Sequence, residues 1–348
     1  MRWPTGLLRV PCVLLLLLGV GTRAQEPAPT LTHGPLRGHI DTHTIHVWAR
    51  ATADGTYTLH LQSLVDAEAT TCTATATPAA DHTLQFVATA LTAGTAYDFW
   101  ITRGELVVYA RGGAPLVTAM PDEASEAVIA FGSCANDLLF REQPIWGRIL
   151  ARSPQALVLL GDTPYIDDGT VEGRRRRHRA FFEFPPIRAV LSALPTWTIW
   201  DDHDYATNDQ FGAVKGSETA RGVFLEYHAH ASYGDGTRGI YTSFRRGPIE
   251  VFLLDTRSFA DTETSVLAPG ERSLLGKAQT EWLQQGLLRR RRRSRCSRAA
   301  WCGTAACGPK RRTAGATGRS SCKDCMVGCA CIASKASCWC RATCIAVA

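Results

Sequence analysis

The sequence predicts an α/β fold in which a small β-sandwich precedes a layered α/β domain. Residues 25 to about 120 contain short segments that alternate apolar and polar side chains, such as Thr44–Arg50 and Tyr57–Leu61, with turns between them. From residue 121 the pattern changes to an alternation of strands, loops and helices. Ala127–Phe131 and Ala156–Leu160 are continuous apolar runs, which are typical of strands buried on both faces.

One stretch predicts which type of β-domain residues 25–120 form. In Leu91–Ile101, Gly94 provides a turn in front of a strand, and Tyr97 on that strand is expected to pack on the core. This stretch resembles the signature of a fibronectin type III-like sandwich. Another kind of small β-domain at this place would not change the predicted function.

The α/β domain, residues 121–288, is expected to contain two further strands and two helices. The strands are Thr196–Trp200 and Ile249–Leu254, and the helices are Ile145–Ala151 and Gly222–Ala231. The basic run Arg174–Arg179 fits a phosphate-attracting patch or a solvated face. We favour the solvated face, because charge runs in loops usually point into water.

The first 24 residues have the plan of a secretory signal peptide. Arg2 and Arg9 precede the apolar run Val13–Leu18, and Thr22-Arg23-Ala24 supplies a small-x-small cleavage site. The apolar run is too short to span a bilayer comfortably, which disfavours a membrane anchor. We therefore expect cleavage after Ala24 and a soluble, secreted protein, extracellular or periplasmic, with no membrane span.

Charge and cysteine content divide the chain at about residue 289. From Arg289 onward there are 14 Lys and Arg and one acidic residue, whereas 24 basic residues face 31 acidic ones before it. A mildly acidic body gives no reason to expect a nucleic-acid partner. Ten of the 13 cysteines also lie in the tail, so the body is not a disulfide scaffold. The composition does not indicate an oligomeric state.

Three predicted strands run directly into residues of the kinds that bind metals. The first ends at Cys134, the second at Gly161–Asp168, and the third at Asp201–Asp209. In open α/β sheets, ligands lie beyond the carboxyl ends of the strands, so the three tips are expected to converge. Together they offer a thiol, carboxylates, a phenol and an imidazole, which suit a transition metal beside a harder, oxygen-liganded cation. Taken singly, each motif more often has a structural role, as a buried cysteine or a turn, and only the three in chain order favour a shared site.

The ordered set of these motifs resembles the PhoD-type alkaline phosphatase family of calcineurin-like metallophosphoesterases, which are related to purple acid phosphatases. The resemblance rests on Phe131–Cys134, Leu160–Asp167, Trp200–Asp204, Asp255–Arg257 and Leu275–Leu283, and extends over roughly residues 30–288. It implies a layered metallophosphoesterase sandwich that hydrolyses phosphate mono- or diesters.

The resemblance also implies roles for six residues. Cys134 and Tyr165 bind a ferric ion, and Asp162 bridges it to a second cation, so that iron is used together with calcium. Asp202 is a further metal ligand, and Asn208 is a weaker candidate. His203 hydrogen-bonds the phosphoryl oxygen or protonates the leaving group. The expected partners are small phosphate esters, and the choice between monoesters and diesters stays open.

The second half of such a fold usually contributes a Gly-Asp-x-His motif, which is missing here. Residues 289–348 form instead a basic, cysteine-rich tail that we expect to be disordered, with a sheet edge left exposed. The alternatives are a zinc knot at Cys322, Cys325, Cys329 and Cys331 and a disulfide-rich appendage, although the tail has no second C-x-x-C and no histidine. The rival functions are a non-catalytic secreted binding protein, an inactive remnant of such an enzyme, and a zinc protein.

A shifted reading frame explains the tail best. In a G/C-rich gene, one slip turns codons for apolar residues into codons for Cys, Trp and Ser. Read from the third nucleotide of each codon, back-translation of Ala330–Ala346 permits an apolar strand that ends in Gly-Asp-Met-His. The same offset from Arg298 gives a second family-like segment.

Sequencing the gene and its transcript across codons 286–348 tests this interpretation. We expect the offset frame to encode Gly-Asp-Met-His and to continue beyond the present stop. If the transcript confirms the present frame, the frame slip happened only in the ancestry of the gene, and the chain is better explained as an inactive remnant.

Overall fold

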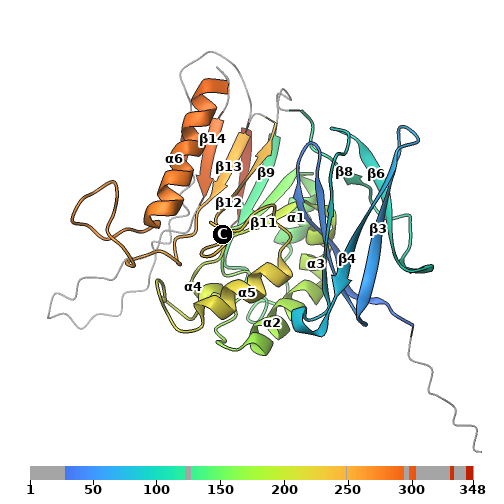
Figure 1. Ribbon diagram of the computed structural model, residues 1–348, viewed down its shortest axis with the longest axis horizontal. Helices are drawn as coiled ribbons and strands as arrows, with labels where there is room; N and C mark the ends of the chain where they lie inside the picture. The colour runs from blue at the N-terminus through green and yellow to red at the C-terminus, as the bar shows by residue number, and fades with distance from the viewer. Residues whose placement is uncertain are drawn as a thin grey trace, which may run out of the picture.

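The computed structural model describes residues 28–121, 127–247, 249–293, 298–302, 330–332 and 342–347. They form a β-sandwich beside a layered α/β body (Figure 1). The predicted signal peptide lies outside the described residues. Within them, no helix is both long and apolar enough to cross a membrane.

The N-terminal part is a sandwich of two antiparallel sheets. One sheet contains β1 (Leu31–Ile40), β2 (Ile45–Ala51) and β5 (Thr83–Ala88), with the short 3-10 helix η1 (Pro78–Ala80) leading into β5. The other contains β4 (Ala69–Ala76), β3 (Gly55–Ser63), β6 (Ala96–Arg103) and β7 (Leu106–Tyr109), and β8 (Leu116–Val117) pairs with β6. Side chains from both sheets share one core, because alternate residues of each strand face inward.

Tyr97 packs in this core as predicted. Its side chain is fully buried, and its hydroxyl accepts a hydrogen bond of 2.9 Å from the backbone N–H of Thr92. A tyrosine near the start of a strand that bonds to the backbone a few residues upstream fixes the corner between two strands.

The α/β body contains two sheets. The first is parallel, in the order β11 (Thr196–Thr198), β10 (Ala156–Leu159), β9 (Ala127–Gly132) and β16 (Ala342–Val347). The second is mixed, in the order β12 (Thr242–Arg246), β13 (Ile249–Leu253), β14 (Arg298–Cys302) and β15 (Ala330–Ile332). The strands predicted at residues 127–131, 156–160, 196–200 and 249–254 are thus confirmed within one or two residues.

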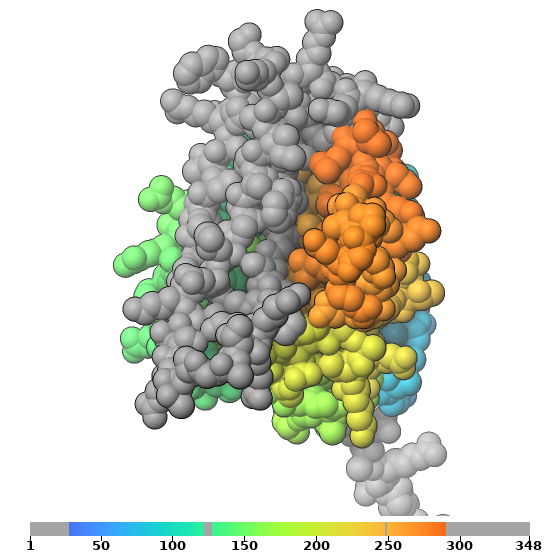
Figure 2. Space-filling model, turned by 90° about the vertical axis from the view of Figure 1, so that its left-hand side faces the viewer, coloured from blue at the N-terminus to red at the C-terminus, as the bar shows by residue number. Residues whose placement is uncertain are grey.

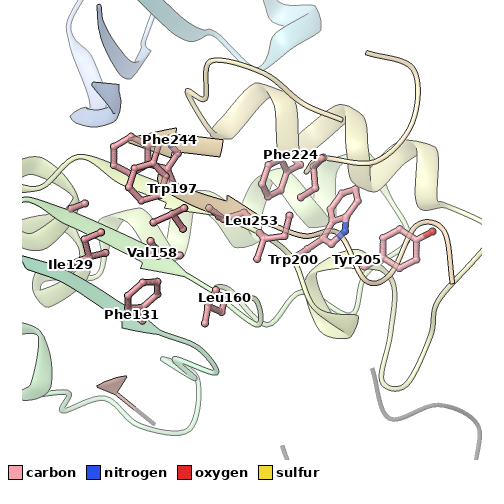
Figure 3. Close-up of a cluster of buried hydrophobic side chains, with 14 of the residues drawn as sticks. Ile129, Phe131, Val158, Leu160, Trp197, Trp200, Tyr205, Phe224, Phe244 and Leu253 are labelled. Atoms are coloured by element: carbon pink, nitrogen blue, oxygen red, sulfur yellow. The ribbon is translucent and has the colours of Figure 1, made fainter. Parts of the chain in front are cut away.

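Helices cover the outer faces of the two sheets. On the first sheet lie α1 (Ile145–Ala151), α2 (Val171–Glu183) and α3 (Pro185–Ala193), and on the second lies α6 (Gly276–Arg293). Figure 2 shows α6 and the loop before it (orange) at the surface of the molecule. Between the sheets, Phe131 and Val158 of the first pack with Phe244 and Leu253 of the second (Figure 3). The strands are apolar throughout because both faces of each sheet are covered.

Two further helices lie below the strand tips. They are α4 (Asp202–Tyr205) and α5 (Ser217–Tyr227). The helix predicted over 145–151 is confirmed, but the one predicted over 222–231 begins earlier, at Ser217, and ends at Tyr227. After Tyr227 the chain is extended, because the carbonyl of Ala229 accepts a 2.7 Å hydrogen bond from the backbone of His39 on β1.

The arginine run is not the solvated face that we predicted. It lies in α2, and only Arg176 within the run is largely exposed, at 68% of its side chain. Arg174 is buried and donates to the carbonyls of Asp204 and Tyr205, at 2.8 and 3.1 Å. The neighbouring arginines 175, 177 and 179 pair with carboxylates of other elements. Helical spacing turns most of the run toward the body, which the charge pattern alone does not reveal.

The expected disorder of the tail is wrong for the residues that the structure describes there. α6 continues to Arg293, and β14, β15 and β16 join the sheets, with β16 covering the edge of β9 and β14 that of β13. Strand edges offer unpaired N–H and C=O groups, which an extended segment satisfies whatever its side chains. Of the four cysteines in the alternative zinc knot, Cys331 lies in β15, and Cys322, Cys325 and Cys329 lie outside the described residues.

The joint between the sandwich and the body is buried and polar. Trp48 on β2 donates to the carbonyl of Glu226 at 2.8 Å. Asp81, after η1, accepts hydrogen bonds from Arg50 of its own domain and from Arg179 and Tyr227 of the body. Burial opposes ionisation of Asp81, but these donors hold its pKa well below its usual value. The sandwich is therefore fixed against the body.

Four histidines are buried at or near this joint. Burial, together with neighbouring positive charges, lowers the pKa of His178 to about 3 and that of His46 to about 4, and it lowers the pKa values of His228 and His230 well below 6.5. Arg174 and Arg177 contribute to the shift at His178, and His39 contributes at His46. All four rings are therefore neutral at physiological pH.

These rings should make the fold sensitive to acid. Their pKa values are lower in the folded chain than in the unfolded chain, so the unfolded chain binds protons first as the pH falls. Above pH 6.5 the buried histidines cause no loss of stability. Below pH 6.5 the free energy of unfolding should decrease by up to about 1.4 kcal/mol per histidine per pH unit. Urea unfolding at pH 8, 6 and 5 measures this decrease. His178→Phe should make this decrease with falling pH shallower, and an unchanged slope in this variant would contradict the explanation.

Candidate metal centre

The three predicted strand tips do come together. β9 and β11 both pair in parallel with β10, so their carboxyl ends lie at the same edge of the sheet. Side-chain ligand atoms of Asp162, Asp202 and His203 lie within 4.8 Å of one another there, and both aspartates are buried. The parallel register thus gathers groups from chain positions 40 residues apart.

Asp162 lies between two groups of ligands. On one side, its Oδ2 is 3.8 Å from the Sγ of Cys134, and the Tyr165 hydroxyl interacts with both side chains. On the other side are Asp202 and His203. The backbone N–H of His203 donates to Oδ1 of Asp162 at 3.3 Å. One carboxylate is therefore shared by a thiol–phenol set and a carboxylate–imidazole set, which is the arrangement that a bridging ligand needs.

Backbone conformation at the tips fixes these positions. Cys134 and Asp162 both have positive φ, at 56° and 51°, which is uncommon outside glycine and is maintained here by surrounding contacts. The Cys134 N–H donates to the carbonyl of Gly161 at 3.1 Å. Gly161 itself has φ of 104°, and a Cβ there would meet the backbone nitrogen of Asp201 at 2.4 Å. A glycine is thus required for the β10 and β11 tips to approach each other.

His203 is oriented by a residue to which we assigned no role, Asp167. Nδ1 of His203 lies 2.7 and 2.8 Å from the two carboxylate oxygens of Asp167, and its ring lies 4.6 Å from that of Tyr165. The backbone N–H groups of Ile166 and Asp167 both donate to the carbonyl of His203. Burial lowers the pKa of His203, but the bond to Asp167 and the nearby carboxylates outweigh it and raise that pKa. Nε2 is the ring nitrogen left for a ligand or substrate.

Arg257 is a second residue that sequence reasoning did not place in the site. It is buried, its Nε donates to Oδ1 of Asp201 at 2.6 Å, and a terminal nitrogen lies 4.0 Å from Asp202. Asp255 supports it by accepting bonds from the N–H groups of Arg257 and Ser258 and from Trp200 Nε1, at 2.9 to 3.0 Å. The Asp-Thr-Arg motif was visible in the sequence, but its contact with the third strand tip was not.

Asn208, the weaker ligand candidate, stands apart from the group. It is exposed, and its amide donates to the carboxylate of Asp209 at 2.8 Å. The turn that carries it does touch the site, because the N–H of Asp209 donates to Oδ2 of Asp202 at 2.5 Å. The described contacts therefore give Asn208 no direct part in the cluster.

Negative charge is crowded at the tips. Burial and the neighbouring Asp201 and Asp202 raise the pKa of Asp162 to about 7, and burial with nearby acidic groups raises the pKa of Asp204 well above its usual value. Burial raises the pKa of the Cys134 thiol to about 11 and also raises that of Tyr165. A multivalent cation would offset this repulsion and favour the thiolate and tyrosinate forms, so the donor set fits a metal.

Comparisons with known proteins agree on the fold. A family model described as PhoD-like phosphatase matches residues 129–302, half of the chain, and so continues past residue 288, where our resemblance ended. The solved structure of PhoD is 17% identical with a TM-score of 0.58, and it covers 72% of this chain. A purple acid phosphatase from yellow lupin (Lupinus luteus) is 12% identical with a TM-score of 0.52, covering 73%. No curated protein sequence matches.

The chain spans only part of both structures. It corresponds to 58% of the PhoD chain and 48% of the lupin chain. At these identities the likeness shows the fold, a mixed arrangement of sheets and helices, and nothing finer.

Substitution of Gly161 tests whether the absence of a side chain there allows the tips of β10 and β11 to approach each other. Gly161→Ala should lower the stability by more than about 2 kcal/mol or displace Asp162, because its Cβ has no room and its φ is positive. Gly222→Ala in α5, where a Cβ meets nothing within 4 Å, is the control and should stabilise by about 0.5–1 kcal/mol. Urea unfolding and titration with iron or calcium measure both effects. Equal behaviour of the two variants would contradict the packing argument.

Proposed function

Because this chain belongs to the PhoD-like phosphatase family, we propose that it hydrolyses phosphate esters at the tips of β9, β10 and β11. The observation that carries the proposal is the position of Asp162 between Cys134 with Tyr165 on one side and Asp202 with His203 on the other. Phosphate monoesters and diesters are both candidate substrates.

The proposed cofactors are a ferric ion and calcium. A thiolate and a tyrosinate are ligands that stabilise ferric iron, so Cys134 and Tyr165 would hold it, while Asp162 and Asp202 offer oxygen atoms to the second cation. When bound, the two cations polarise the phosphoryl group and lower the pKa of the attacking water.

The protein groups orient the substrate and move a proton. With Nδ1 of His203 held by Asp167, Nε2 is the ring nitrogen that can hydrogen-bond a phosphoryl oxygen or donate a proton to the leaving oxygen. Arg257 holds Asp201 at the head of α4, and this keeps Asp202 and His203 in place. Because Nδ1 is bonded to Asp167, His203 can exchange a proton with the substrate only through Nε2.

An inactive remnant or a binding protein is the second candidate. No histidine follows His230, and neither β14, β15 nor β16 contains an aspartate or histidine. These strands occupy the edges where further ligands of the family are expected, so they complete the sheets without completing a Gly-Asp-x-His motif. Metal affinity then depends on the first-half residues alone.

Two finer assignments are also part of the proposal. The sandwich of one three-stranded and one five-stranded antiparallel sheet, with its buried Tyr97 corner, supports a fibronectin III-like domain. The basic, apolar and small-residue order of the first 24 residues supports export. N-terminal sequencing of protein secreted by an expressing cell tests the cut after Ala24.

Hydrolysis and metal content together test the function. Nitrophenyl phosphate and bis-nitrophenyl phosphate should be cleaved by the full chain, and iron analysis should find about one ion per chain. Asp202→Asn should lower the rate at least about 100-fold, whereas Glu105→Gln on the exposed β6–β7 hairpin should not change it. Bound iron without hydrolysis would favour the binding protein, and absence of both would favour the remnant.

Asp167→Asn separates positioning from metal binding. It should lower kcat about 10- to 100-fold by releasing the ring of His203, with KM and iron content nearly unchanged. Loss of iron in this variant would instead make Asp167 part of the metal site.

A further inference from the structure

Helix α2 begins where the β10 tip ends. Asp168, the last residue of that tip, accepts hydrogen bonds from the backbone N–H and the hydroxyl of Thr170, at 2.8 and 2.6 Å. Thr170 in turn caps the helix, because its side chain accepts a 3.0 Å bond from the N–H of Gly173. The start of α2 is therefore fixed relative to the loop that carries Asp162 and Tyr165.

Arg177 of α2 holds the loop that follows the β9 tip. Its guanidinium donates to the carboxylate of Asp137, three residues after Cys134, and the two side chains are only 11% and 3% exposed. The N–H of Asn136 donates to the carbonyl of Cys134 at 2.9 Å, and the N–H of Cys134 donates to the carbonyl of Gly161 at 3.1 Å. Because breaking a buried ion pair is costly, Arg177 fixes where this loop, and with it the Cys134 thiol, lies relative to α2.

Arg174, three residues earlier in α2, holds the β11 tip. It is buried, and its guanidinium donates to the backbone carbonyls of Asp204 and Tyr205, at 2.8 and 3.1 Å. These carbonyls belong to α4, the four-residue helix that begins with Asp202 and His203. Arg174 therefore holds the helix that carries the carboxylate–imidazole set.

The arginines of α2 face different parts of the molecule. Arg174 and Arg177 are three residues apart, so they lie on one face of the helix, toward the strand tips. Arg175 lies on another face, where it pairs with Glu226 and donates to the carbonyl of Ala79 in the sandwich. The first two arginines therefore act on the tips and Arg175 on the joint, although all three belong to the same helix.

We propose that Arg174 and Arg177 are positioning residues that set the separation between the thiol–phenol set and the carboxylate–imidazole set. Arg177 acts through Asp137 on the thiol side, and Arg174 acts through α4 on the imidazole side. Because both arginines extend from one turn of the same helix, the two sides keep a constant spacing before any cation binds. The proposal rests on the metal-dependent hydrolysis proposed above, and it assigns each side of the site a separate support.

Hydrogen exchange of the metal-free full chain tests the two supports directly. In Arg177→Gln, the amide of Cys134 should exchange at least about 10-fold faster, because the loop that carries it is released. In Arg174→Gln, the amide of Tyr205, which bonds to the α4 cap at 3.0 Å, should be the one that exchanges faster. Arg175→Gln removes an ion pair from the same helix and should change neither amide. Amides in the β2–β5 pairing report unfolding of the whole chain in each variant.

Metal titration tests the consequence for the site. Arg177→Gln should weaken iron binding at least about 10-fold and change the visible charge-transfer absorption of the thiolate and tyrosinate ligands, with calcium binding nearly unchanged. Arg174→Gln should weaken calcium binding and leave the iron absorption unchanged. Arg177→Lys and Arg174→Lys keep the positive charge, so they should show the same two patterns at smaller amplitude and stay informative if a glutamine variant does not fold.

The outcomes separate the positioning role from the function on which it rests. Equal loss of protection at both tips in either variant, or the same loss in Arg175→Gln, would mean that α2 only stabilises the fold and would overturn the proposal. Unchanged exchange at both tips would overturn it as well. Selective loss at one tip, in a chain that binds neither iron nor calcium, would support the positioning role and reject the metal-dependent function.

Discussion

The close approach of the β10 and β11 tips is the constraint on which the site depends. Parallel pairing brings the tips to one edge of the sheet, and the lack of a side chain at Gly161 allows the backbone of Asp201 to lie directly against it. With any side chain at residue 161, the carboxylates of Asp162 and Asp202 would be held farther apart. The chemistry proposed for this edge therefore depends on a position that carries no functional group.

Neighbouring residues hold the crowded acidic side chains at that edge in place. Arg257 pairs with Asp201, while Asp255 anchors the turn that carries Arg257. Arg174 holds the carbonyls behind α4 from the other side. A metal site must keep its carboxylates together before the ion arrives, and these buried contacts supply the required rigidity.

The sandwich is a structural partner of the body and not a separate appendage. Asp81 accepts donors from both parts, and the buried histidines lie where the parts meet. Movement of the sandwich would break these polar contacts together, so the two parts should respond to pH as one unit.

Local patterns in the sequence determined the strands, the buried Tyr97 and the order of the polar strand tips, because apolar runs and turn residues act over a few positions. Only the tertiary structure decided which arginines of α2 are buried, that Asp167 and Arg257 serve the site, and that Asn208 stands outside its contacts. It also placed tail strands on sheet edges where the sequence predicted disorder. Such contacts join residues far apart in the chain, and backbone pairing at an edge does not depend on side-chain pattern.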